Sequence, residues 1–190
     1  MGQPKLQLPF GPETMLQRVV RILESVVSPI VVVASAGQEL PELPENILIA
    51  YDEQPQQGPL HGITVGLAAL SDISVAAYIS ACDVPLLKPE FVAKMILSLE
   101  DYELAIPQEE NHFHPLAAVY KTHLAKRAQS LIESGKSRPF DLIQSSNTNR
   151  IDVAELKTID PELDSLYNVN TPEEYQSALA RAGFTSPQSD

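Results

Sequence analysis

The stretch "VAAYISACDVPLL", residues 75–87, decides the fold of this chain. Its first half is an apolar run without polar alternation, which is typical of a strand buried on both faces of a sheet. A carboxylate, Asp83, follows the run directly, and Pro85 fixes the turn after it. The stretch therefore predicts a buried strand that ends at a polar position.

Comparable segments alternate along the rest of the chain. Other apolar runs predict strands at "IVVVA" (30–34), "ILIAY" (47–51), "ELAIP" (103–107) and "HPLAAVY" (114–120). Helices are predicted at 13–28, at 58–70, after Pro89, and in the last segment, where Thr171 and Glu174 form a capping box. This alternation predicts a three-layer, doubly wound α/β fold with a largely parallel sheet.

Length and composition limit the number of domains, the compartment and the partners to be expected. The length of 190 residues suggests a single domain, which we expect to span 1–184, with a loose tail at 185–190. The only cysteine is Cys82, so no internal disulfide forms and a reducing compartment is expected. We find neither a signal-peptide pattern nor an apolar stretch long enough for a bilayer, and we expect a cytoplasmic protein with no membrane partner. The net charge of −12 argues against a nucleic-acid partner but does not exclude a small anionic substrate.

Two acidic residues follow predicted strands. Ligands of open α/β sheets bind beyond the carboxyl ends of the strands, where Asp83 and Asp52 are expected to lie. Asp83 is either a ligand of Mg²⁺, which prefers a few hard oxygens, or a cap for the next helix; its position does not decide. Asp52 could contact a sugar hydroxyl, a base or a metal-bound water, but its position alone favours an ordinary turn residue.

Other candidate residues are ambiguous on their own. Lys5, in "MGQPKLQLPFG" (1–11), precedes a predicted helix and could meet a phosphate, although a lone lysine is more often solvated. His112 and His114 share one face of a predicted strand without an evident third metal ligand, which favours a structural role. We interpret Cys82 as a small buried hydrophobe and not as a nucleophile.

Taken together, these residues resemble the molybdenum cofactor guanylyltransferases, a family of metal-dependent nucleotidyltransferases. The resemblance extends from Met1 to about Gly183. It rests on stretches in the same order as in the family: "MGQPKLQLPFG", "GPLHGI", "CDVPLL", "HPLAAVY" and "NVNTPEEY".

The resemblance implies an activity and roles for particular residues. Such enzymes join the GMP part of GTP to molybdenum-loaded molybdopterin and release pyrophosphate, with Mg²⁺ as cofactor. By this similarity, GTP would be contacted by Lys5, Asp52 and Asp83, and Asp83 would also bind the metal as the catalytic residue. The pterin side would be lined by Asn168, Asn170, Lys136 and Arg138. Transient contact with proteins that deliver molybdopterin or mature molybdoenzymes is also implied.

The chain departs from the family pattern at its start. The family begins with a strand followed by Leu-Ala-Gly-Gly-x-Ser-x-Arg-Met-Gly, and Met1 and Gly2 fall on the last two positions of that signature. We therefore expect upstream codons that encode the strand and the glycine-rich loop. Because that first strand is central in the family fold, we also expect a slot between two unpaired strand edges here.

Two alternatives remain open at this stage. A cytidylyltransferase or a sugar-phosphate nucleotidyltransferase would share the "CDVP" motif. The stretches "GPLHG" and "NVNTPEEY" favour a guanylyltransferase. Alternatively, the chain is an inactive binding or regulatory relative, because the glycine-rich loop is missing.

Overall fold

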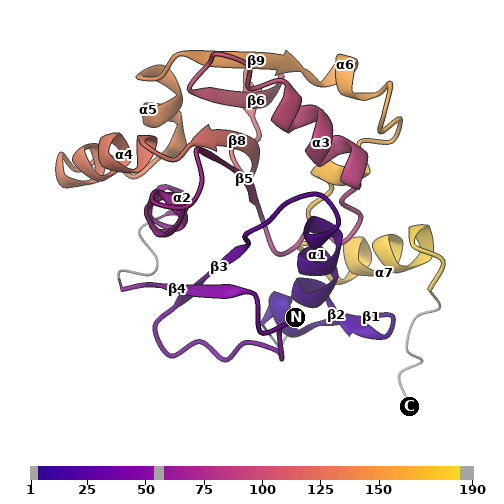
Figure 1. Ribbon diagram of the computed structural model, residues 1–190. Helices are drawn as coiled ribbons and strands as arrows, with labels where there is room; N and C mark the ends of the chain where they lie inside the picture. Colours follow the sequence, from indigo (N-terminus) through magenta and orange to yellow (C-terminus); the bar gives the residue numbers. More distant parts are fainter. Residues whose placement is uncertain (1–3, 54–57, 185–190) are drawn as a thin grey trace.

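The computed structural model describes residues 4–53 and 58–184 (Figure 1). The strands are β1 (Pro9–Phe10), β2 (Glu13–Thr14), β3 (Val31–Ser35), β4 (Leu48–Asp52), β5 (Ala76–Ser80), β6 (Leu104–Glu109), β7 (His112–Phe113), β8 (Ala117–Lys121) and β9 (Thr148–Asp152). The α-helices are α1 (Met15–Glu24), α2 (Pro59–Leu70), α3 (Pro89–Leu97), α4 (Leu124–Glu133), α5 (Pro139–Gln144), α6 (Val153–Leu156) and α7 (Pro172–Arg181). Two short 3₁₀ turns are η1 (Lys5–Gln7) and η2 (Asp164–Leu166). The predicted tail at 185–190 lies outside the described residues, and the extent of the domain stays a prediction.

A five-stranded sheet carries most of the core. Side chains alternate across it, so that Leu104, Ile106 and Tyr120 face one side while Ala105 and Val119 face the other. The first set packs under α2, α4 and α5, and the second packs against α3 and α6. Figure 1 shows α2, α4 and α5 on the opposite side of the sheet from α3. The predicted three-layer α/β arrangement is therefore confirmed.

The sheet is mixed: β5, β6 and β9 run in one direction, as the sequence predicted for most strands, and β8 and the short β7 run against them. β5 and β6 each pair antiparallel with β8, β6 pairs antiparallel with β7, and β6 pairs parallel with β9. The chain turns back after β6 through the short β7 and enters β8 from the opposite end. An apolar run marks a buried strand but carries no information on its direction, so the pattern of "HPLAAVY" did not reveal the reversal.

β3 and β4 form a separate pair. They run parallel in the register Val31↔Leu48 to Ser35↔Asp52, and among the described residues neither pairs with the five-stranded sheet. The prediction that "ILIAY" is buried is wrong, because Leu48 is 45% exposed and Tyr51 is 56% exposed. Leu48 and Tyr51 point to opposite faces of β4, so neither face of this strand is fully covered.

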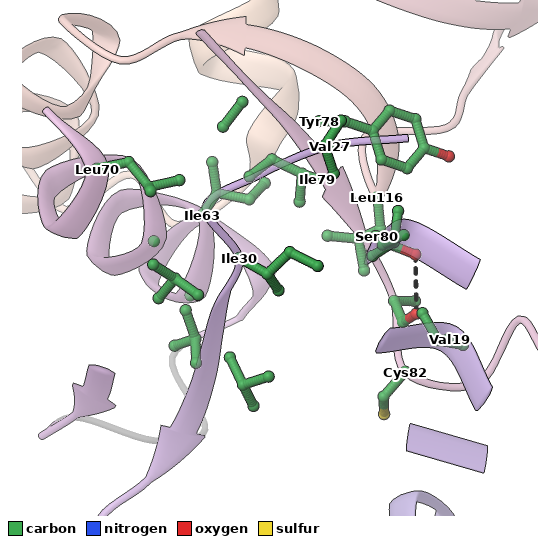
Figure 2. Close-up of a pocket in the computed structure, with 18 of the residues that line it drawn as sticks. Val19, Val27, Ile30, Ile63, Leu70, Tyr78, Ile79, Ser80, Cys82 and Leu116 are labelled. Atoms are coloured by element: carbon green, nitrogen blue, oxygen red, sulfur yellow. Dashed lines mark hydrogen bonds between the residues drawn. The ribbon is translucent and has the colours of Figure 1, made fainter. Parts of the chain in front are cut away.

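A cavity of about 700 Å³ separates β3 from β5. Both strands line it with backbone and apolar side chains, and α1 and α2 line it from the two faces of the sheet. Figure 2 shows Ile30 beside β3, Ile63 on α2 and Ile79 on β5 around this space. Within the described residues β3 pairs only with β4, and β5 only with β8. The expected slot between two unpaired strand edges is thus present.

The helix boundaries follow from local sequence signals. Thr14 caps α1 in a reciprocal box with Gln17, and the predicted box of Thr171 and Glu174 begins α7. α2 begins at Pro59 after Gly58, which has φ of 93°. A Cβ on Gly58 would lie 3.2 Å from the carbonyl oxygen of Ser137, so this glycine allows the 135–138 loop to approach the start of α2. Of the helices described, none is both long and apolar enough to span a bilayer.

Candidate functional site

A cluster of polar side chains forms just beyond the end of β5. The ammonium of Lys5 donates to Asp83 Oδ2 at 2.9 Å and to Asn170 Oδ1 at 2.5 Å. The side-chain amide of Asn168 donates to Asp83 Oδ1 at 2.8 Å. We call these four residues the Asp83 cluster. The side chain of Asp83 is only 15% exposed, against 35% for Lys5, so the cation covers a largely buried carboxylate.

Local backbone structure positions the two asparagines. The backbone N–H of Val169, between them, donates to the carbonyl oxygen of Asp83 at 2.9 Å. Glu174 Oε2 accepts from the backbone N–H of Asn170 at 2.7 Å and of Thr171 at 2.9 Å. The capping box of α7 therefore orients Asn170 as well as beginning the helix. The sequence "NVNTPEEY" thus encodes both a helix start and one wall of the site.

A buried ion pair supports the same wall from behind. The Lys88 ammonium donates to Asp160 Oδ1 at 2.7 Å, and Asp160 Oδ2 accepts from the backbone N–H of Ser165 at 2.8 Å. Ser165 Oγ in turn accepts from the backbone N–H of Lys88 at 3.0 Å. Burial acts to raise the pKa of Asp160, but the hydrogen bonds from Lys88 and Ser165 outweigh it and lower the pKa overall. These contacts join the start of α3 to the segment that leads to Asn168.

Sequence reasoning missed this ion pair. Lys88 and Asp160 are separated by 72 positions, and neither belongs to a spaced motif. The available signal was weak: Lys88 directly precedes the helix-opening Pro89. Pairing between such distant residues becomes visible only when the fold brings them together.

The other predicted site residues lie at separate positions. Asp52 is the last residue of β4, opposite Ser35 in the register, and lines the cavity between β3 and β5. Lys136 is exposed, with its ammonium 3.7 Å from Asp141 Oδ1. Arg138 is the N-cap residue of α5, in the loop that approaches Gly58. The roles of all seven predicted residues stay predictions.

Cys82 lies next to Asp83 but is poorly suited to be a nucleophile. Burial, reinforced by the neighbouring Asp83 carboxylate, raises the pKa of the Cys82 thiol to about 11. The side chain packs beside the buried cluster that includes Leu6 and Val32. At neutral pH the thiol is protonated, which agrees with its interpretation as a small hydrophobe.

The donor set around Asp83 limits the kind of metal site. In the part of the chain that the structure describes, no group of three or more His, Cys, Asp or Glu side chains could form an all-protein cage. Mg²⁺ is usually bound through one or two carboxylates, with substrate phosphates and water completing the shell. A carboxylate has about four lone-pair sites, and the two hydrogen bonds to Asp83 leave some of these unused. Asp83 therefore fits a Mg²⁺ ion that a bound nucleotide helps to hold.

Comparison with known proteins identifies the family of this chain. Residues 1–149 match the family model described as "MobA-like NTP transferase domain". The chain is 35% identical over 186 residues to the "Probable molybdenum cofactor guanylyltransferase" of Mycobacterium avium (strain 104), covering 96% of this chain and 89% of that protein. It is also 35% identical over 165 residues to the protein of the same name from Mycobacterium tuberculosis (strain ATCC 25618 / H37Rv), covering 84% and 80%.

Solved structures show the same fold. Molybdopterin-guanine dinucleotide biosynthesis protein A from Archaeoglobus fulgidus superposes with a TM-score of 0.74 at 22% identity, covering 96% of this chain and 92% of that chain. The 2-C-methyl-D-erythritol 4-phosphate cytidylyltransferase of Thermus thermophilus superposes with a TM-score of 0.72 at 16% identity, covering 96% and 95%. The fold is therefore that of the α/β nucleotidyltransferases. On the family match and the identity to its curated relatives, this chain belongs to the MobA-like NTP transferase family.

Proposed function

We propose that this nucleotidyltransferase transfers GMP from GTP to molybdenum-loaded molybdopterin and releases pyrophosphate. The observation that carries the proposal is the Asp83 cluster, in which one lysine, one carboxylate and two amides meet beyond the end of β5. The names of the mycobacterial relatives support GTP and molybdopterin as the two substrates.

Lys5 and the asparagines would bind and orient the phosphates. The Lys5 ammonium is already at the mouth of the cluster and would exchange part of its contact with Asp83 for a phosphate oxygen of GTP. The side-chain amides of Asn168, which contacts Asp83, and of Asn170, which contacts Lys5, would donate to the phosphate of the acceptor. Such positioning of two anions in line is the main contribution that a protein makes to this class of reaction.

Asp83 would hold the metal. Bound Mg²⁺ would neutralise charge on the phosphate oxygens and stabilise pyrophosphate as it leaves. The protein's own part is to keep the Asp83 carboxylate aimed at the nucleotide, and the Asn168 amide fixes one of its oxygens.

The bond changes need no strong general base. An oxygen of the acceptor phosphate bonds to the α-phosphorus of GTP, and the bond from that phosphorus to the bridging oxygen breaks, so that pyrophosphate carries away the electron pair. The acceptor phosphate is already ionised at neutral pH. The reaction therefore does not require the Cys82 thiol, which is protonated at that pH.

The remaining predicted residues have secondary roles in this proposal. Asp52 would contact GTP from the end of β4, and Lys136 and Arg138 would attract the second anionic substrate toward the start of α2. Reaction in the cytoplasm and transient contact with molybdopterin-delivering or molybdoenzyme-maturation proteins also belong to the proposal.

The direct test is a transfer assay with the purified chain. Mg²⁺, GTP labelled at the α-phosphate and molybdate-loaded molybdopterin are mixed, and labelled dinucleotide and pyrophosphate are measured together. Stoichiometric appearance of both products is expected with GTP, and none without Mg²⁺. Pyrophosphate release with CTP but not GTP would overturn the choice of nucleotide, and absence of transfer with either nucleotide would refute the proposed activity.

A further inference from the structure

A second, smaller cavity adjoins the Asp83 cluster. It encloses about 170 Å³ and is bounded by the start of α2 at Pro59, the segment 112–117, and the segment 165–168. Asn168 lines this cavity and also donates to Asp83, so the cavity and the predicted metal ligand share one side chain. A ligand in this cavity would therefore lie next to the reacting phosphates.

Two imidazoles line the same cavity. The rings of His112 and His114 lie 4.8 Å apart, centroid to centroid, with an interplanar angle of 85°. The Nε2 atom of His114 is buried and has no hydrogen-bond partner among the described residues. Buried polar atoms of this kind are uncommon, because leaving one unsatisfied costs about 1–3 kcal/mol. The "HFH" segment therefore has a feature that a purely structural role does not explain.

The protonation state of His114 suits recognition by hydrogen bonding. Burial, together with the nearby His112, lowers the pKa of His114 below its usual value. At neutral pH the imidazole is uncharged, with one nitrogen as donor and the other as acceptor. A neutral ring of this kind complements the polar edge of a heterocycle better than it complements a phosphate.

The shape and the remaining walls restrict the ligand. Pro59, Pro115 and Leu166 make the cavity apolar between its polar groups. Its volume equals that of about six molecules of liquid water, which is enough for one flat bicyclic ring whose substituent extends out of the cavity. The loop of Lys136 and Arg138 approaches the start of α2 at Gly58, and the next residue, Pro59, lines the cavity.

We propose that this cavity binds the heteroaromatic ring of the phosphate acceptor, and that His112 and His114 determine specificity for that ring. The inference rests on the proposed function, since it takes the acceptor to be a pterin with a phosphate on its side chain. The ring lies between the imidazoles and Asn168, and the side chain extends its phosphate toward Asp83. The nucleotide binds on the other side of Asp83.

The test compares His114→Gln and His112→Gln with His123→Gln as the matched control. His123 is 58% exposed, contacts Glu103, and is not among the residues that line the cavity. Neopterin monophosphate is the fluorescent probe for the ring subsite, and calorimetry with Mg-GTP measures the nucleotide subsite. The KM for molybdopterin and kcat are measured in the transfer assay.

We expect His114→Gln to weaken neopterin monophosphate binding about tenfold or more and to raise the KM for molybdopterin similarly. The Kd for Mg-GTP and kcat are expected to stay within about twofold, because the nucleotide subsite and the metal ligand are untouched. His112→Gln, at an exposed position, is expected to act in the same direction with a smaller effect, which guards against a folding defect in the His114 variant. His123→Gln is expected to match the wild type.

Unchanged binding of neopterin monophosphate in both cavity variants would overturn the proposal. A selective loss of Mg-GTP affinity would also overturn it, because the cavity would then hold the base of the nucleotide. Failure of the proposed function looks different: the wild type would not transfer GMP at all, whatever the outcome of the probe titrations.

Discussion

At the scale of single residues, both carboxylate oxygens of Asp83 accept a hydrogen bond from another residue of the site. Lys5 donates to Oδ2 and Asn168 donates to Oδ1, so the carboxylate is fixed in orientation before any substrate arrives. Such preorganisation lowers the cost of aligning groups during the reaction. It also means that its two partners, Lys5 and Asn168, are expected to respond together when Asp83 is changed.

Replacing Asp83 by asparagine tests its role with little change in shape. The Asp83→Asn variant is expected to lose transfer activity by about 1,000-fold, because a metal ligand supplies several kcal/mol of transition-state stabilisation. Its thermal midpoint is expected to remain close to that of the wild type, since the backbone contact from Val169 is kept.

The matched control is Asp72→Asn, at an exposed position after α2. Activity is measured by pyrophosphate release and folding by circular dichroism. Activity in Asp83→Asn equal to that of Asp72→Asn would remove the metal assignment.

The residues of the site differ in how well the sequence predicts them. Asp83 is recognisable because it follows a buried apolar run at the end of a strand. Lys5 is not, since its partner lies 78 positions away and only the family resemblance indicated a role. The ion pair of Lys88 and Asp160 and the cavity beside His114 have no sequence pattern at all, because both are made by segments that meet only in the folded chain.

At the scale of elements, Glu103 connects the start of β6 to α4 and to β9. Its carboxylate accepts two hydrogen bonds from Arg127 on α4, one from the backbone N–H of Asn147 before β9, and contacts His123. The Arg127 guanidinium and then the Asn147 N–H lower the pKa of Glu103 from 4.5 to about 2. The residue that precedes β6 thus anchors both α4 and β9.

This anchor predicts an acid-dependent loss of stability. Since the pKa of Glu103 is lower in the folded than in the unfolded state, its contribution is fully present above pH 4.5 and is lost as the pH falls toward 2. Glu103→Gln is expected to be less stable than the wild type at pH 7, with a difference that shrinks as the pH falls through this window.

Urea denaturation at several pH values measures this dependence. Glu109→Gln, at an exposed position at the end of β6, is the control and is expected to follow the wild type. A stability difference for Glu103→Gln that stays constant from pH 7 to about pH 2.5 would contradict the account.

Elements also show where sequence patterns mislead. The predicted strands exist, but "HPLAAVY" runs against its neighbours and "ILIAY" is largely exposed. Hydrophobic runs report that a segment is capable of burial. Strand direction and actual coverage depend on which neighbours the whole fold supplies.

At the scale of the whole molecule, the cavity between β3 and β5 divides the sheet. Among the described residues, β3 and β5 each have no strand paired on the side that faces this space, and apolar side chains from α1 and α2 line it. The cavity is shaped for an extended chain that would pair with both edges. Leu6 lies near one end of it, in contact with the cluster that contains Val32 and Cys82.

A strand fused ahead of Met1 that pairs with β3 and β5 is therefore expected to stabilise the protein. Fusing five alternating valine and isoleucine residues and a short glycine loop ahead of Met1 is expected to raise the free energy of unfolding by about 1–3 kcal/mol, as burial of the new side chains exceeds their ordering cost. Slowed hydrogen exchange in β3 and β5 would accompany the change. An extension of equal length made of glycine and serine is the control, and equal stability of the two fusions would show that the cavity does not accept a strand.

The central claim is that Asp83 is the centre of a site for Mg-GTP, and titration calorimetry of the purified chain tests it most directly. Mg-GTP and Mg-CTP are titrated into the wild type, and Mg-GTP into Asp83→Asn. We expect one Mg-GTP site per chain, at least about tenfold weaker binding of Mg-CTP, and loss of the site in Asp83→Asn. Tighter binding of Mg-CTP, no binding of Mg-GTP, or unchanged binding in the variant would contradict it.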